Sequence, residues 1–502
     1  MIPPFLLLSA AETRAVEAAA MSNGLSGAAM MEAAGAAVVS FIARSVSKRP
    51  AAILCGPGAN GGDGFVVARL LKELGFPVRV GLLGEASQLK GDAALMAKLF
   101  DGAVEPLSPA ILDGAGIIVD ALFGTGLARA IEGAARETVI AANAHAAPVF
   151  AVDIPSGVDA DAGAVLGVAI EAAATIAFIA KKPGHLLFPG RALSGAVTVA
   201  DIGVQDEWVA SVKPSAFENH PALWAARWRR PSFLTHKYDR GHAAIVSGPR
   251  LKTGAARLAA TAALRSGAGL VTMLSPKDAC DENAAHLTAI MLREADGADA
   301  IASIVADRRF TATLIGPAAG VGPQTKGRAL AILRSPAGAV LDADALTSFE
   351  GDAGTLFAAL REDDVLTPHE GEFARLFPGL KGQGKLAAAR AAAARAKAVI
   401  VLKGADTIIA APDARAVINA NAPFDLATAG SGDVLAGIIA GMRAQGLPGF
   451  EAAAAGVFLH GAAGQIAGPG LVAEDLADAL RKVLRTLFAP PAQQTGEPGE
   501  KP

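Results

Sequence analysis

The stretch "CGPGANGGDGFVVARLL" at residues 55–71 indicates the fold of the first half of the chain. It follows a short apolar run, "AAILCG" at 51–56, and passes through five glycines in nine residues into a segment with apolar side chains at helical spacing. A strand, a glycine-rich loop and a helix in this order are typical of an α/β sheet. The loop is either a plain turn with Asp63 as a helix cap, or a place where backbone amides meet an anionic ligand.

The same alternation continues through the first half. Continuous apolar runs separated by helical segments predict a parallel sheet with helices on both faces. Before the first strand, residues 10–46 are expected to form one or two helices broken near "SNGLS". The further strands are expected at "PVRVGLL" (77–83), "GIIVDAL" (116–122), "PVFAVDI" (148–154), "ATIAFIA" and "AVTVADIG".

The pattern restarts after residue 240, which indicates a second α/β domain. We place the boundary near 215–230, in a stretch with three prolines and few signs of strands, and expect domains at 1–220 and 221–490. The tail at 491–502 is polar, rich in proline and glycine, and expected to be disordered. Strands are expected in "HAAIVSG", "GLVTMLS", "TATLIGP", "AGAVLDAD", "DDVLTPH" and "AVIVLKG", and helices in "TGAARLAATAALRSGA" and "SGDVLAGIIAGMRA".

Composition narrows the class of partner. The 502 residues carry a net charge of -3 without a long basic or acidic block, which argues against nucleic acid or an anionic membrane as the main partner. Cys55 and Cys280 match no disulfide or metal pattern, and no uncharged apolar stretch approaches the roughly 20 residues of a membrane span. We expect a cytoplasmic protein with small-molecule substrates, and a homo-oligomer whose size the sequence does not specify.

Three loops of the first half follow predicted strands and therefore meet at one edge of the sheet, where open α/β sheets bind ligands. Besides the opening loop, these are "GTGLARA" after the strand that contains Asp120 and "PSGVDADAG" after the strand that ends at Asp153. The opening loop matches neither the P-loop nor the "GxGxxG" pattern. Three such loops at one edge favour a ligand site over a plain turn.

The motifs of the first half resemble a known family. "CGPGANGGDGFVVAR", "DALFGTGLAR", "VDIPSGVDADAG" and "KKPGHLLFPGRALSGAVTVADIG" are similar, in order, to the epimerase domain of the bifunctional NAD(P)H-hydrate repair enzymes, over roughly residues 8–205. The resemblance implies a Rossmann-like, three-layer αβα domain that interconverts the R and S forms of hydrated NADH and NADPH. It also implies a K⁺ ion beside the hydrated ring, held by Asn60, Asp120 and Ser156.

The same resemblance implies the substrate contacts. Asp153 faces the reacting ring as the acid/base, and two loops hold the dinucleotide through their backbone amides. Ala59 stands where the family usually has the first of two asparagines, which removes one polar contact. The loop residues are Ala59, Asn60, Gly61, Gly62, Asp63, Gly124, Thr125, Gly126, Leu127, Ala128, Arg129 and Ala130.

The second half contains "LATAGSGDVLAGIIAG", in which Gly430, Ser431 and Gly432 open a predicted helix and Asp433 lies in its first turn. Exposed amides there can hold a transferring phosphate, and Asp433 can accept a proton from a hydroxyl group. A capped buried helix would show the same residues, since aspartate is favoured near helix starts. The cluster resembles the anion hole and catalytic base of ribokinase-like kinases.

Other motifs narrow that superfamily. "HKYDRGHAAIVSG", "LIGPAAGVG", "LTPHEGEFARL" and "VLKGADT" resemble the ADP-dependent NAD(P)H-hydrate dehydratase domain, with the match running from about 232 to 470. This implies a ribokinase-like αβα domain and Mg²⁺ bound with ADP. The implied adenine-nucleotide contacts are Lys403, Gly404, Ala405, Asp406, Thr407 and Gly432, and the implied substrate contacts are Ala255, Gly316, His369 and Asp433.

Several alternatives stay open at this point. His369 can be a hydrogen-bonded structural histidine, and Lys403 a surface lysine. Ala318 replaces the second glycine of the usual Gly-Pro-Gly pattern, so the loop "GPAAG" departs from the family at this position. The "GSGD" cluster also suits a phosphotransferase acting on a small alcohol, and the first domain can be a non-catalytic dinucleotide sensor. The resemblance itself implies epimerisation followed by ADP-dependent dehydration of the S form through a phosphorylated intermediate.

Overall fold

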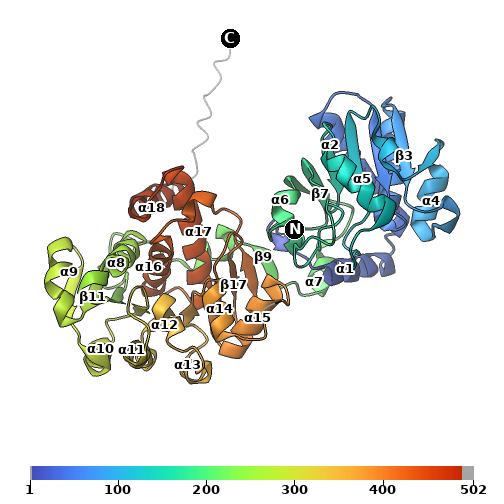
Figure 1. The fold of residues 1–502 in the computed structure, drawn as a ribbon. Coiled ribbons are helices and arrows are strands. Elements are labelled where there is room, and N and C mark those ends of the chain that lie inside the picture. The colour runs from blue at the N-terminus through green and yellow to red at the C-terminus, as the bar shows by residue number, and fades with distance from the viewer. Residues whose placement is uncertain (1–2, 381, 489–502) are drawn as a thin grey trace, which may run out of the picture. The chain divides into compact units, whose positions relative to one another are not determined.

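The computed structural model describes residues 3–380 and 382–488, and Figure 1 traces the chain. The chain divides into two compact units. The first is Met1–Glu218 with Gly384–Leu386, and the second holds the rest of the chain. The expectation of disorder at 491–502 lies outside the described residues.

The first unit contains a seven-stranded sheet in the order β4-β3-β2-β5-β6-β7-β8, and every neighbouring pair is parallel. The predicted strands are confirmed, and the short β4 is an addition. Strand order reverses between β2 and β5, which creates the switch point where such sheets bind ligands. The strands are β2 (Ala51–Cys55), β3 (Val78–Leu82), β4 (Val104–Pro106), β5 (Ile117–Ala121), β6 (Val149–Val152), β7 (Ala174–Phe178) and β8 (Ala196–Ala200).

Helices cover both faces of this sheet, as the continuous apolar strands predict. Neighbouring residues of β2 point to different cores: Ile53 packs with the α2 and α3 side chains, whereas Leu54 packs with the α5 side chain Val139. The predicted break near "SNGLS" separates α1 from α2. The helices are α1 (Ala10–Ser22), α2 (Gly27–Ser45), α3 (Ala59–Glu73), α4 (Gly91–Leu99), α5 (Gly133–Asn143), α6 (Gly190–Leu193) and α7 (Asp206–Ser211).

Helix α2 is the one described helix that is long and apolar enough to cross a membrane, by length and composition alone. Core helices of globular proteins pass the same test. Here the α2 side chains Val38 and Ile42 are buried in the core that also contains Ile53 and Phe65. Packing on the sheet therefore accounts for the apolar face of α2.

The second unit has strands in the order β18-β17-β16-β15-β14-β13-β10-β11-β12. The strands from β16 to β12 are parallel, as predicted, whereas β17 and β18 add an antiparallel hairpin that was not predicted. Strand β12 was also missed. The bounds are β10 (His242–Val246), β11 (Leu270–Ser275), β12 (Met291–Glu294), β13 (Ala312–Ile315), β14 (Gly338–Leu341), β15 (Val365–Leu366), β16 (Val399–Leu402), β17 (Ile408–Ala410) and β18 (Ala416–Ile418).

The helices of this unit form two groups in Figure 1. Helices α8, α16 and α17 pack together, and α16 contacts β10, β13 and β14, whereas α10 packs with α11, which contacts β14. The three-layer prediction is confirmed. The helices are α8 (Gly254–Arg265), α9 (Cys280–His286), α10 (Gly297–Val305), α11 (Pro323–Leu333), α12 (Ala343–Thr347), α13 (Ala353–Ala359), α14 (Glu370–Leu376), α15 (Lys385–Ala396), α16 (Ser431–Ala444), α17 (Gly449–Ala467) and α18 (Ala473–Leu487).

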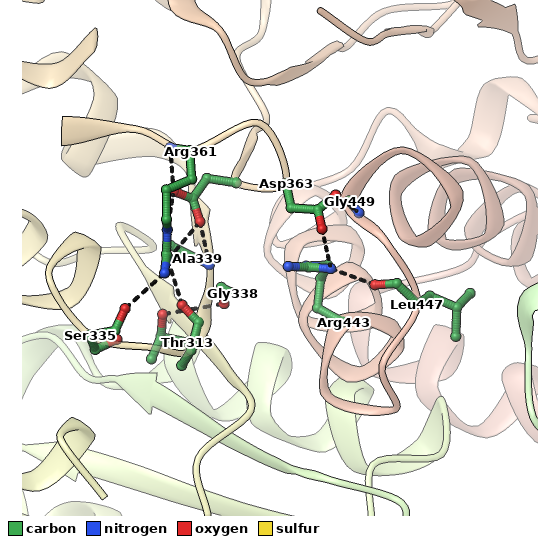
Figure 2. Close-up of polar contacts among 11 residues, drawn as sticks. Thr313, Ser335, Gly338, Ala339, Arg361, Asp363, Arg443, Leu447 and Gly449 are labelled. Atoms are coloured by element: carbon green, nitrogen blue, oxygen red, sulfur yellow. Dashed lines mark hydrogen bonds and ion pairs between the residues drawn. The ribbon is translucent and has the colours of Figure 1, made fainter. Parts of the chain in front are cut away.

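Figure 2 shows the polar network at the amino ends of β14 and β15. The buried carboxylate of Asp364 accepts the backbone N–H of Ala339 at 2.9 Å and pairs with the Arg361 guanidinium at 3.0 Å. Arg443, in the last turn of α16, donates to the Leu447 carbonyl oxygen at 2.5 Å. The Arg443 guanidinium also lies 3.9 Å from Asp363 Oδ2, just before β15, so the C-terminal end of α16 lies at the amino ends of these strands and its N-terminus lies toward the carboxyl edge.

Candidate active sites

The glycine-rich loop of the first unit is shaped by close backbone approaches. A Cβ atom added to Gly61 would lie 1.8 Å from the Gly56 carbonyl oxygen, and one added to Gly56 would lie 1.7 Å from the Leu122 carbonyl oxygen. Only glycine fits such distances. The backbone N-cap of α3 is Gly58, so the alternative in which Asp63 caps this helix is wrong. Asp63 lies inside α3 and is buried.

The three predicted ion ligands gather around residues 122–124. The Ser156 hydroxyl donates to Asp120 Oδ1 at 2.6 Å, and the Ser156 backbone N–H donates to Asp120 Oδ2 at 2.7 Å. The Phe123 N–H donates to Ser156 Oγ at 2.8 Å. Asn60 lies beside the same segment, because a Cβ atom added to Gly124 would be 3.4 Å from its Oδ1. The structure therefore brings these three predicted residues together.

These residues fit a cation with oxygen ligands. Burial raises the pKa of Asp120 to about 6, against the hydrogen bonds from Ser156, so a nearby positive charge would favour its ionised form. Asn60 would contribute its amide oxygen, since Oδ1 is the atom that lies beside Gly124. Within residues 3–380 and 382–488, no three His, Cys, Asp or Glu side chains are grouped to hold a metal. An ion here would therefore take the mixed carboxylate, amide and hydroxyl oxygens of this set.

Asp153 occupies a constrained position after β6. Its φ of 66° is in the left-handed region, and its Oδ1 accepts from Lys182 Nζ at 2.5 Å and from the Phe178 N–H at 3.2 Å. His185 Nδ1 accepts the Lys182 N–H at 2.9 Å, so His185 Nε2 donates to the Asp153 carbonyl oxygen at 3.0 Å. Burial lowers the pKa of His185 to about 3, so this histidine is neutral. The sequence motifs had not singled out Lys182 or His185 for a role.

Further carboxyl groups lie near Asp153. Burial raises the pKa of Asp63 well above its usual value, and the negative charges of Asp153 and Glu17 raise it further. Burial also raises the pKa of Glu17, which lies on α1, and Asp153 again adds to the effect. A carboxyl group that keeps its proton beside a carboxylate can serve as a proton donor.

The remaining predicted residues of this site lie on more open backbone. Ala59 is exposed at the first position of α3, so the family's missing asparagine leaves no buried gap. The loop at 124–130 between β5 and α5 is half-buried to exposed along its length. Both segments follow strands next to the switch point, where a long ligand has access to backbone groups.

The second unit places the "GSGD" cluster at the start of α16, as predicted. Gly430 is the N-cap with a φ of 83°, in the left-handed region that favours glycine. The Ser431 hydroxyl lies 3.1 Å from His460 Nε2. Burial lowers the pKa of His460 to about 4, so the imidazole is neutral and holds the serine side chain in place. His460 lies on α17, and its position in the sequence had indicated no such contact.

Asp433 belongs to a partly buried charge cluster. Burial raises its pKa to about 6, and the negative charges of Asp342 and Asp344 add to this, whereas Lys403 opposes it. Lys403 Nζ donates to Asp342 Oδ1 at 2.7 Å, and a Cβ atom added to Gly432 would lie 3.6 Å from the same Nζ. Although burial acts to lower it, the pKa of Lys403 is raised, chiefly by Asp342. The alternative of a surface lysine is wrong, since the Lys403 side chain is 18% exposed.

His369 has a structural contact of its own. It is the N-cap of α14, where its Nδ1 accepts the Gly371 N–H at 2.9 Å, and the Glu372 carboxylate accepts the His369 N–H at 2.9 Å. The side chain is 55% exposed. The structural alternative therefore has a specific basis, while the exposed face of the ring still allows a substrate contact.

The other predicted contacts lie on neighbouring segments. A Cβ atom added to Gly316 would lie 1.7 Å from the Asp342 carbonyl oxygen, which places Gly316 beside the charge cluster. Residues 403–407 form a turn after β16, in which the Thr407 hydroxyl donates to the Gly404 carbonyl oxygen at 2.9 Å. Ala255 is half-buried in the first turn of α8.

Comparison with known proteins covers both units. Residues 243–485 match a family model described as NAD(P)H-hydrate dehydratase, and residues 27–184 match one described as YjeF-related protein N-terminus. The bifunctional NAD(P)H-hydrate repair enzyme Nnr of Moorella thermoacetica is 37% identical over 91% of this chain and 92% of its own length. The chain belongs to this family.

A second relative agrees with the membership. The Escherichia coli bifunctional NAD(P)H-hydrate repair enzyme Nnr is 35% identical, over 86% of this chain and 84% of its own length. Among solved structures, an ADP/ATP-dependent NAD(P)H-hydrate dehydratase from Bacillus subtilis, co-crystallised with ATP and Mg²⁺, is 27% identical. The match covers 51% of this chain and 93% of the Bacillus subtilis chain, with a TM-score of 0.44.

This member of the repair-enzyme family carries a strained residue in the loop "GPAAG". Ala318 has a φ of 54°, in the left-handed region that glycine adopts at little cost. A Cβ atom added to Gly248 would lie 2.2 Å from the Ala318 carbonyl oxygen, so the loop also has little room to relax. The departure from the family pattern noted in the sequence therefore has a backbone cost.

We expect Ala318→Gly to leave the protein as stable or more stable. Relief of the left-handed strain, about 1–2 kcal/mol, outweighs the extra backbone entropy of glycine, about 0.5–1 kcal/mol. The matched control is Ala319→Gly, because Ala319 is buried and is not among the residues with a positive φ. The control should lower the melting temperature. A similar loss for both variants would contradict the strain.

Proposed function

We propose that the first unit interconverts the R and S hydrates of NADH and NADPH, and that the second unit dehydrates the S hydrate with ADP. The main support is that the chain aligns with the bifunctional repair enzyme of Moorella thermoacetica over 91% of its length. Each unit also places an aspartate, buried in the first unit and half-buried in the second, beside a glycine-rich loop at the carboxyl edge of its sheet. These aspartates are Asp153 and Asp433.

In the second unit, Asp433 would remove the proton from the ring hydroxyl. The hydroxyl oxygen would then bond to the terminal phosphorus of ADP, and AMP would leave. The backbone amides at 430–432 would stabilise charge on the transferring group, with Lys403 Nζ next to Gly432. The C–O bond would break next, releasing phosphate, and loss of a ring proton would restore the reduced nicotinamide. Phosphate is a far better leaving group than hydroxide.

We expect Mg²⁺ to enter the second site with the nucleotide and to neutralise phosphate charge. No set of three carboxylates in the described residues is placed to hold a metal, so the phosphates would supply much of its coordination. Lys403, Gly404, Ala405, Asp406, Thr407 and Gly432 would contact ADP. Ala255, Gly316 and the exposed face of His369 would contact the hydrate.

In the first unit, Asp153 would act as the acid/base on the hydrated ring. Its Oδ1 already accepts from Lys182 and Phe178, which leaves Oδ2 for the substrate. Asn60, Asp120 and Ser156 would hold K⁺, which would supply a positive charge beside the polar end of the ring. The glycine-rich loop at 59–63 and the loop at 124–130 would bind the dinucleotide through backbone amides.

Two single substitutions should separate the activities. Asp433→Asn should lower ADP-dependent formation of NADH absorbance at least about 100-fold, because a general base typically contributes 100-fold or more. Epimerisation should persist in this variant. Asp153→Asn should do the reverse, slowing R-to-S conversion while the pure S hydrate is still dehydrated. Accumulation of a stable phosphoester in place of phosphate would instead identify a kinase.

Dehydration should depend on pH through Asp433. Its pKa is raised to about 6, so the proton-accepting form is lost as the pH falls through that value. Initial rates with the S hydrate and ADP should fall about tenfold per pH unit below it. Asp342→Asn removes a negative charge near Asp433 and should move this fall in rate to lower pH. The exposed substitution Asp478→Asn should leave it in place, and equal shifts in both variants would refute the assignment.

Potassium should stabilise the folded first unit. We expect KCl to raise the melting temperature of this unit by a few degrees over tetramethylammonium chloride at equal ionic strength, because a ligand of the native state shifts unfolding. Ser156→Ala should abolish this increment. Ser194→Ala removes another buried serine hydroxyl, which donates to Gly190, and should retain it. An increment that survives Ser156→Ala would place the ion elsewhere.

A further inference from the structure

The centre of the first unit contains a lysine with no access to solvent. The Lys182 side chain is 0% exposed, and a buried ammonium is unfavourable unless charge and hydrogen-bond partners surround it. Two acceptors meet it: Asp153 Oδ1 at 2.5 Å and the Phe178 carbonyl oxygen at 3.0 Å. Because a surface lysine would avoid this cost, the buried position indicates a task at Asp153.

The segment around Lys182 is held in place from several sides. The Leu8 N–H donates to the Lys181 carbonyl oxygen at 3.0 Å, which ties the start of the chain to this segment. His185 accepts the Lys182 N–H through Nδ1 and donates through Nε2 to the carbonyl oxygen of Asp153. The same short segment therefore fixes both the carboxylate and the left-handed backbone of Asp153.

The charged groups around Asp153 are unevenly distributed. Glu17 approaches from α1 with Arg14 near it, Asp63 approaches from α3, and His185 lies in the segment that carries Lys182. Lys181, in the same segment, pairs with Glu218. The Lys182 ammonium pairs with Asp153. At Asp63, burial and its two acidic neighbours Asp153 and Glu17 all favour the protonated form. Two carboxyl groups in one site thus have opposite environments, which is the arrangement that divides acid and base roles.

We propose that Lys182 is a positioning residue for epimerisation: its ammonium pairs with one oxygen of the Asp153 carboxylate, which acts as the base, while Asp63 is the proton-carrying acid. The inference rests on the proposed epimerase function of the first unit. Asp63 would give its proton to the departing ring hydroxyl, the C–O bond would break with its electron pair going to oxygen, and the ring nitrogen would form a C=N bond. Water would then add to the opposite face, forming the new C–O bond and passing its proton to Asp153.

The step is balanced and reversible. One water leaves and one water enters, no oxidant or reductant is needed, and exchange of protons with solvent restores both carboxyl groups. The two epimers are reached by attack on opposite faces of the same planar cation. The ion pair with Lys182 acts through Asp153, so Lys182 itself does not touch the ring.

The test is the pH profile of epimerisation by the full-length chain, followed by resolving the two hydrates without ADP and subtracting the uncatalysed rate. We expect a bell-shaped profile for the unsubstituted protein. Lys182→Met should shift the acid limb to higher pH by at least about one unit, because the carboxylate loses its cation. Lys182→Arg should move the acid limb most of the way back to its position in the unsubstituted protein. The matched control Lys181→Met removes the neighbouring lysine, which pairs with Glu218, and should leave the profile unchanged.

A second variant keeps the inference testable if Lys182→Met does not fold. Asp63→Asn keeps the size of the side chain and should lower kcat at least about 30-fold, with little change in KM. A kcat equal to that of the unsubstituted protein in Asp63→Asn would overturn the acid role. An acid limb that stays in place in a folded Lys182→Met variant would overturn the positioning role. If the unsubstituted chain shows no epimerisation at any pH, the proposed function of the first unit fails instead.

Discussion

A carboxylate buried at the end of a β-strand needs a hydrogen-bond donor or a cation beside it. Much of this protein's chemistry follows from which of these partners each buried aspartate has. Parallel strands bring their carboxyl ends to one edge, so the aspartates there are crowded and shielded from water. Asp120 is partnered by the hydroxyl and amide of Ser156. Asp153 takes the ammonium of Lys182, and Asp342 takes that of Lys403.

The partners differ in how much of the aspartate's charge they offset and in which of its oxygens they leave free. Ser156 and a backbone amide stabilise Asp120 without cancelling its charge, so the site keeps an attraction for a cation. Lys182 pairs with Asp153 but occupies only one of its two oxygens. Among residues 3–380 and 382–488, no ammonium is in direct contact with Asp433. Lys403 is engaged with Asp342, and burial raises the Asp433 pKa to about 6. A base that titrates close to neutral pH is suited to taking a proton from a hydroxyl group and returning it.

The fold and the loops were largely predictable from the sequence, because they depend on short runs of neighbouring residues. Continuous apolar runs such as 51–55 and 399–402 are short and bounded by turn residues, which indicates buried strands. The glycine cluster that follows 51–55 reflects backbone approaches closer than any Cβ atom allows. The short strands β4, β12, β17 and β18 were missed, because three or four residues carry too little periodicity to be recognised. Asn60, Asp120 and Ser156 were proposed together from motifs, and they meet around one loop.

The sequence by itself determined two α/β units, the loops at their carboxyl edges, and the aspartates those loops carry, because these depend on runs of neighbouring residues. Only the tertiary structure decided the electrostatic state of those aspartates. Lys182 lies 29 residues from Asp153, Lys403 lies 61 residues from Asp342, and His460 lies 29 residues from Ser431. Burial and charge at such sites depend on which distant segments fold against them, and no local pattern records that.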